Sequence, residues 1–115
     1  MNKERRRRLS VTVSSLEELS NDTEREEVKQ TLDDSISEVE CVTDEEQEAL
    51  DSMPENLQSS QRYYDMEDNI SDLEDAVSDL QTAYDDFADD EDTAYDDIQP
   101  DVESAIESIN EAIDR

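Results

Sequence analysis

Carboxylates are the most abundant side chains here that could do chemistry, since Asp and Glu supply 37 of the 115 residues and His is absent. Two carboxylates can carry out general acid–base catalysis when a shaped pocket holds them and separates their pKa values. Nothing in the sequence indicates such a pocket. Without His, the chain also lacks the commonest general base and the commonest metal ligand. We therefore expect no catalytic site and no enzyme activity.

A run of oxygen-bearing side chains over residues 89–100 could supply ligands to a calcium ion. An EF-hand loop needs Gly at its sixth position and a bidentate Glu at its twelfth. Counted from Asp89, these positions hold Ala94 and Pro100, so the motif fails. Cys41 is the only cysteine, which leaves no internal disulfide and no cysteine metal cluster. We expect no metal ion and no cofactor.

The composition favours helices over strands and tight turns. Glycine is absent, and tight hairpins and phosphate-binding loops depend on it. Leu, Ile, Val and Phe together number 22. That share is close to the level of about 20% below which a strongly charged chain is expected to be disordered. The spacing of the apolar residues must therefore decide between a folded and a disordered chain.

That spacing is helical. Seven apolar residues recur at alternating steps of four and three, the pattern of a coiled-coil seam. They are Met66, Ile70, Leu73, Val77, Leu80, Tyr84 and Phe87. Similar stripes predict helices over about residues 3–19, 22–52, 60–88 and 99–114, with a connection at 54–59. No apolar run approaches the roughly 20 residues of a membrane-spanning helix.

Local signals set the expected helix ends. Asn21 with Glu24 has the spacing of a capping box, Ser59 or Ser60 can cap the third helix, and Pro100 suits the first turn of the last one. Cys41, next to an apolar stripe, is expected to be partly buried. The aromatic residues are expected to pack in the core; they are Tyr63, Tyr64, Tyr84, Phe87 and Tyr95.

These signals predict one all-α domain over residues 1–115. Stripes of two apolar positions in seven are narrow, which suits long helices lying side by side. We expect an elongated antiparallel helical hairpin or a small helix bundle with coiled-coil-like seams. The basic start does not lead into a continuous apolar segment, so no signal peptide is expected. The prediction is a soluble protein of the bacterial cytoplasm.

Part of the sequence resembles a family of short, acidic helical-hairpin proteins from gut Firmicutes and their phages. The resemblance rests on the basic start at residues 2–8 and on residues 44–82. This second stretch includes Met-Pro-Glu-Asn-Leu-Gln at 53–58 and Leu-Glu-Asp-Ala-Val at 73–77. Residues 9–43 and 85–101 fit the family pattern poorly. The resemblance implies a helical hairpin and an origin in a mobile element, and it implies no particular activity.

The charge is uneven along the chain. The net charge is −28, and residues 63–114 contain 20 Asp and Glu but no Lys or Arg. Two such helices side by side would carry about one charge per ~2 Å of rod, against one per ~1.7 Å of axis in duplex DNA. A rigid rod of this kind could imitate DNA in the groove of a basic protein.

The leading functional hypothesis is therefore an inhibitor that mimics DNA, similar in composition to phage anti-restriction and anti-CRISPR proteins. Its partner would be a basic, nucleic-acid-binding protein; direct binding to nucleic acid or to a membrane is not expected. The surrogate phosphates would be Asp72, Asp75, Asp79, Asp85, Asp86, Asp89, Asp90, Glu91, Asp92, Asp96, Asp97 and Asp101.

Other readings of the same charge stay open. It could be a solvated surface or an adaptation to high salt. The chain could be a self-associating coiled-coil structural or accessory phage protein, with a homodimer as one form, or an acidic chaperone or antitoxin for one basic partner. Arg5, Arg6, Arg7 and Arg8 are expected to extend along the helix start or to contact the acidic half, within the chain or between copies.

Overall fold

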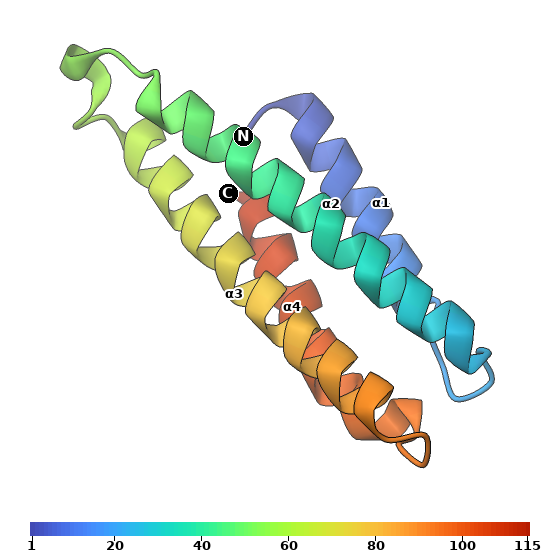
Figure 1. Ribbon diagram of the computed structural model, residues 1–115. Coiled ribbons are helices and arrows are strands. Elements are labelled where there is room, and N and C mark those ends of the chain that lie inside the picture. The colour runs from blue at the N-terminus through green and yellow to red at the C-terminus, as the bar shows by residue number, and fades with distance from the viewer.

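Four α-helices with short connections make up the protein. They are α1 (Lys3–Glu17), α2 (Arg25–Asp51), α3 (Gln61–Asp89) and α4 (Tyr95–Asp114), and a single 3-10 turn, η1 (Glu55–Leu57), lies between α2 and α3. The computed structural model describes residues 1–115. Successive helices run in opposite directions, and α1 closes the bundle by packing on both α2 and α4 (Figure 1). The predicted all-α fold is confirmed.

The apolar stripes meet along the axis of the bundle. All four helices contribute to one core cluster of 20 buried residues. In α3 and α4, alanines alternate with larger residues, and Ala76, Ala83, Ala105 and Ala112 are fully buried. Small side chains let two helix backbones approach closely. The sequence of large and small residues thus lets α3 and α4 pack tightly despite their many charges.

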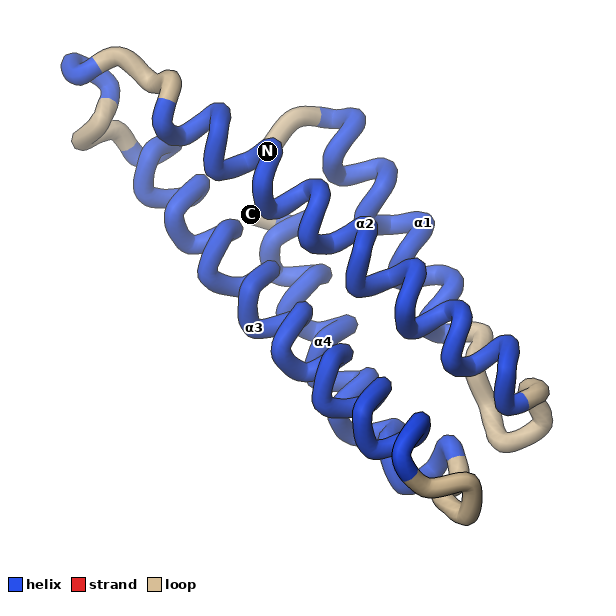
Figure 2. Tube along the Cα trace, in the orientation of Figure 1, coloured by secondary structure: helices blue, strands red, loops and turns tan.

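The bundle is long and narrow, with extents of 54 × 22 × 18 Å. Figure 2 shows that almost the whole length is helical, with loops confined to the two ends. The α2–α3 hairpin projects beyond α1 and α4 at one end (Figure 1). A separate small cluster of Leu50, Met66 and Ile70 holds the projecting part together. No helix combines the length and the hydrophobicity needed to cross a bilayer.

The predicted capping box at the start of α2 is wrong. The helix begins at Arg25, its N-cap residue is Glu24, and no side chain caps it. Asn21 instead accepts a hydrogen bond of 3.1 Å from the backbone N–H of Asp96, at the start of α4. Asn21 caps the helix that lies next to it in the folded structure, and the spacing of residues in the sequence does not reveal which helix that is. By contrast, Ser60 caps α3 as expected by accepting from the N–H of Tyr63.

The predicted start of α4 at residue 99 is also wrong. The helix begins four residues earlier, at Tyr95, and Pro100 lies inside it. Two features fix the earlier start: the Asp97 carboxylate accepts a hydrogen bond from the N–H of Ala94, and both Tyr95 and Ile98 are buried. Burial of these two side chains outweighs the loss of the one N–H that Pro100 cannot donate.

Two side chains expected to be buried are exposed. Cys41 is exposed because it lies one residue before the buried Val42, and adjacent residues on a helix point about 100° apart. Tyr64 is 49% exposed, next to the partly buried Tyr63. Phe87 and Tyr95 are in the core as expected, and Tyr84 packs partly buried against it.

Candidate functional site

The twelve predicted surrogate phosphates lie on the α3–α4 half of the bundle. Six are on α3, three are in the turn between the helices, and three are on α4. The two helices pack side by side in opposite directions (Figure 1). Acidic residues that are far apart along the chain, such as Asp79 and Asp101, therefore share one half of the molecule.

Three of the twelve are partly buried: Asp72, Asp79 and Asp101. Asp72 pairs with Arg115 at 2.7 Å. Asp79 accepts a hydrogen bond of 2.9 Å from the hydroxyl of Ser104, which ties α3 to α4. Asp72 and Asp79 thus contribute to packing, and they are less accessible to a partner than the rest.

The other nine are exposed, and three of these have local hydrogen-bond partners. Asp85 accepts from the Gln81 amide, Asp90 from the N–H of Asp92, and Asp97 from the N–H of Ala94. The remaining six carboxylates have no hydrogen-bond or ion-pair partner within the chain. We call these the free-carboxylate set: Asp75, Asp86, Asp89, Glu91, Asp92 and Asp96.

The acidic turn between α3 and α4 is held by a cation from another helix. Arg25, at the start of α2, donates hydrogen bonds to the backbone carbonyls of Phe87, Asp90 and Thr93. Its guanidinium also lies 4.0 Å from the centre of the Phe87 ring. A cation is favourable at a helix C-terminus because it faces the negative end of the helix dipole. The Arg25 side chain therefore orders the turn by binding backbone carbonyls of the turn. Most of the carboxylates in the turn stay unpaired.

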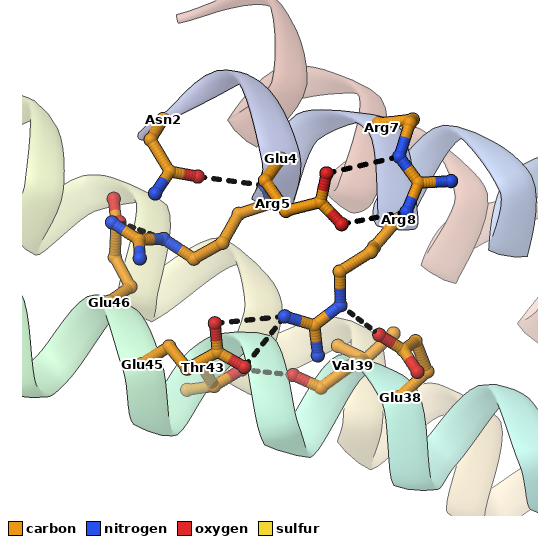
Figure 3. Close-up of polar contacts among 10 residues, drawn as sticks. All are labelled: Asn2, Glu4, Arg5, Arg7, Arg8, Glu38, Val39, Thr43, Glu45 and Glu46. Atoms are coloured by element: carbon orange, nitrogen blue, oxygen red, sulfur yellow. Dashed lines mark hydrogen bonds and ion pairs between the residues drawn. The ribbon is translucent and has the colours of Figure 1, made fainter.

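Two arginines of α1, Arg5 and Arg8, pair with α2 and not with residues 63–114. Figure 3 shows Arg5 and Arg8 reaching across to the second helix. Arg8 contacts Glu38 at 2.5 Å and Glu45 at 2.6 Å. The hydrogen bonds to Glu45 and Glu38 raise the pKa of Arg8 above its ordinary value. Of the alternatives for these arginines, the intramolecular contact exists for Arg5 and Arg8, with its partners on α2 and not in residues 63–114.

Exposed charges at the start of α1 pair locally. Arg7 contacts Glu4 at 2.7 Å, one turn away on the same helix. The hydrogen bond and the charge of Arg7 lower the pKa of the Glu4 carboxyl. Pairs on an open helix surface contribute little to stability. The important contacts of α1 are therefore those that Arg5 and Arg8 make with α2.

A buried polar network joins the halves of the bundle. Glu46 of α2 is 0% exposed and accepts hydrogen bonds from Arg5 at 3.2 Å and from the Asn69 amide at 3.0 Å. The amino group of Met1 lies 3.7 Å from the same carboxylate. The carbonyl oxygen of Asn69 accepts from Arg115 at 3.1 Å. Residues at the ends of α1 and α4 thus meet α2 and α3 around one buried carboxylate.

Sequence reasoning missed Arg25, Glu46 and Asn69. Glu46 gave a signal because it continues the stripe of Val39, Val42 and Leu50 at helical spacing, and Asn69 gave one because it stands three residues after Met66 and four before Leu73. A charged residue at such a position predicts a buried and partnered charge. Nothing in the sequence near Arg25 indicates that its partners are the carbonyls of a turn more than 60 residues away.

The charge density of the acidic half is close to that of DNA. α3 has 29 residues and α4 has 20, so the longer helix extends about 43 Å at a rise of ~1.5 Å per residue. The 20 acidic residues of 63–114 lie along that length. The result is one charge per ~2 Å, against one per ~1.7 Å of duplex axis.

No group of three or more acidic or cysteine side chains is placed to hold a metal ion.

No protein-family model, curated protein or solved structure matches this chain. The resemblance to acidic hairpin proteins of gut Firmicutes and their phages therefore stays a prediction from the sequence.

Proposed function

We propose that this protein is an inhibitor that occupies the nucleic-acid groove of a basic protein by imitating DNA. The observation that carries the proposal is the acidic surface formed by residues 63–114, which contain no Lys or Arg, with six carboxylates that have no partner in the chain. Carboxylates left unpaired on a folded surface are available to arginines and lysines of another protein. A bacterial defence protein that binds DNA is the partner class with the matching charge.

The rigidity of the bundle supports this proposal. A mimic must present its charges without losing conformational freedom on binding, because ordering a flexible segment costs affinity. The free-carboxylate set lies on two long helices and on a turn that Arg25 holds by three backbone contacts. The acidic surface is therefore already formed before a partner arrives.

An acidic chaperone or antitoxin would use the same surface in a different way. Such a protein would bind its basic partner wherever the charges match, whereas a mimic would bind only in the groove. Competition with duplex DNA distinguishes the two. The apolar seams, which could have joined several chains into an assembly, are buried within one chain here.

The first experiment is a pull-down from a bacterial host lysate with the immobilised protein, elution by a salt gradient, and identification by mass spectrometry. DNA mimicry predicts one nucleic-acid-binding protein that is released only at high salt and is displaced by duplex DNA. Ionic interfaces of this kind lose affinity steeply as salt rises. A broad mixture of basic proteins eluting at low salt would contradict the proposal.

Two variants of equal charge sharpen the test once a partner is known. The first replaces the free-carboxylate set by the corresponding amides. The control neutralises six exposed acidic residues of α1 and α2 that have no ion-pair partner: Glu17, Glu27, Asp33, Glu40, Asp44 and Glu48. Mimicry predicts that the first variant loses affinity by at least about 100-fold, since removal of one charge from a buried interfacial pair costs 2–5 kcal/mol. Equal losses in both variants would show that only total charge matters.

A further inference from the structure

The end of the α2–α3 hairpin differs in chemistry from the rest of the surface. We call residues 52–66 the hairpin tip. They extend past α1 and α4, whose nearest residues contact Glu46 and Asn69, further down the hairpin. The tip contains Glu55, Asp65 and Arg62, so its net charge is −1 in a chain of net charge −28. The hairpin tip is thus an almost neutral end on a strongly anionic rod.

The hairpin tip also carries most of the exposed large apolar groups. Three large apolar side chains are exposed: Leu57 at 45%, Tyr64 at 49% and, far from the tip on α1, Val11 at 55%. Met53 and Tyr63 are partly buried against the cluster of Leu50, Met66 and Ile70, and the rings of Tyr63 and Tyr64 pack edge to face at 6.0 Å. Tyrosine and arginine are enriched among residues that dominate binding energy. A single exposed apolar side chain is ordinary, but Leu57 and Tyr64 are both at the same end of the molecule.

We propose that the hairpin tip binds the tip of a second copy of this chain, so that two rods join end to end. Along α3 and α4 two copies repel each other, because residues 63–114 carry 20 acidic residues and no Lys or Arg. At the tips, apolar groups of two copies can meet at low electrostatic cost. A two-fold axis through the contact would pair the same surfaces of both copies.

The charged residues of the hairpin tip suit this arrangement. Arg62 is exposed and has no partner within the chain, and neither does Glu55. In an end-to-end dimer, Arg62 of each copy can pair with Glu55 of the other. The contact is small compared with the ~800 Å² per partner of a stable interface. The dimer is therefore weak and forms at high protein concentration.

Salt dependence separates this dimer from one held by the basic start of α1. Screening weakens the two Arg62–Glu55 pairs but reduces the repulsion between two strongly negative rods by more, so the tip dimer becomes tighter as salt increases. A dimer in which the exposed Lys3 and Arg6 bind the acidic half of a second copy would become weaker. Sedimentation velocity at about 20 mM and about 0.5 M NaCl measures both cases. We expect a dissociation constant roughly tenfold lower at the higher salt.

The shape of the dimer is a second readout. Two rods joined at their tips have a maximum dimension close to twice the 54 Å length of one chain. Rods packed side by side keep nearly the length of one. Small-angle X-ray scattering at high salt distinguishes the two arrangements, and a side-by-side dimer would overturn the proposal.

Matched substitutions locate the contact. Leu57→Gln with Tyr64→Gln removes the exposed apolar groups of the tip, and Val11→Gln removes the one that lies elsewhere. We expect the tip variant to raise the dissociation constant at least tenfold and the Val11 variant to leave it unchanged. Circular dichroism checks that both remain folded. A monomer at all salt concentrations, or an equal loss in both variants, would contradict the tip contact; neither outcome bears on the acidic surface of α3 and α4.

Discussion

In the half of the bundle formed by α1 and α2, the acidic side chains at the helix interface, Glu38, Glu45 and Glu46, pair with arginines of α1. In the half formed by α3 and α4, acidic side chains face water and one another. Arg8 lies between Glu38 and Glu45 in the first half, whereas the second contains no cation from residue 63 to residue 114. Charge thus contributes to helix packing in one half and opposes it in the other.

The contrast shows where the stability of the acidic half must come from. Its cations come from outside residues 63–114: Arg25 acts at the turn after α3, and Arg115 lies beside Asp72 and Asn69 in the first half of α3. Between these places, apolar packing and the hydrogen bond from Ser104 to Asp79 must overcome the repulsion between carboxylates. An acidic surface with so few counter-charges is therefore compatible with folding because the seam below it is tightly packed.

The largest effect is expected from damage to that seam. Leu80 is fully buried in α3, and Leu80→Ala should lower the free energy of unfolding by about 2–5 kcal/mol, the range for a core leucine. Urea denaturation followed by circular dichroism measures the loss. The variant should recover part of its stability in about 0.5 M NaCl, because salt screens the repulsion. A loss well under 1 kcal/mol would mean that something other than the seam holds α3 to α4.

A smaller loss should follow from removing the buried carboxylate that joins the halves. Glu46→Ala leaves Arg5 and Asn69 without their acceptor, and breaking a buried ion pair costs about 3–5 kcal/mol. We expect about 3 kcal/mol, since the Arg5 side chain is 14% exposed and can be partly hydrated. Urea denaturation of Glu46→Ala and of Glu46→Gln gives the comparison. If the amide, which keeps an acceptor for Asn69, is no more stable than the alanine variant, the hydrogen bonds contribute little.

Removal of Arg25, the cation that contacts the acidic turn, should have a local effect on stability. Arg25→Gln removes three contacts to backbone carbonyls and the contact with the Phe87 ring. We expect a loss of about 1–2 kcal/mol from the helix-end charge and the cation–π contact. Hydrogen exchange should become faster at residues 87–94 and stay unchanged near Arg8. Uniform acceleration over all four helices would contradict a local role.

The smallest effect on the free energy of unfolding is expected from the Tyr95 hydroxyl. Burial, with a smaller contribution from the charge of Glu103, raises the pKa of the Tyr95 hydroxyl above its ordinary value. Near pH 10 the unfolded chain loses this proton while the folded protein still keeps it. The free energy of unfolding should therefore fall as the pH rises above about 10.

Tyr95→Phe should reduce that alkaline loss, as measured by urea denaturation at about pH 9 and pH 11. The matched control is Tyr64→Phe, which changes an exposed tyrosine. If both variants follow the wild-type pH dependence, the buried hydroxyl does not contribute.

Helix positions were predictable wherever one periodic pattern determined them. The spacing of Met66 to Phe87 predicts α3 because the same residues that define the period are those buried by neighbouring helices. The start of α4 was missed because Pro100 suggested a helix beginning, and the burial of Tyr95 depends on helices that a local pattern does not include. The pairing partners of Asn21 and Arg25 depend on distant segments in the same way.

The position of the candidate site was predictable from the sequence. Which of its carboxylates are free to contact a partner was not. The sequence shows that residues 63–114 carry no cation, and this places the acidic residues on α3, α4 and their turn. It does not show that Asp72 and Asp79 are engaged in packing, because Arg115 and Ser104 lie 43 and 25 positions away along the chain. Which carboxylates stay free is decided by the tertiary structure.

The order of the helices around the bundle also has a kinetic consequence. Each helix packs on the next one along the chain, and among the main helix–helix contacts that of α1 with α4 joins distant segments. Short connections make the chain entropy lost in each closure small, and folds with mostly local contacts reach the native state in microseconds to milliseconds. α2, α3 and α4 can pack by successive local steps, whereas the contact of α1 with α4 joins the two ends of the chain and requires both helices to be in place. α3 and α4 can therefore pack together before α1 docks on α4.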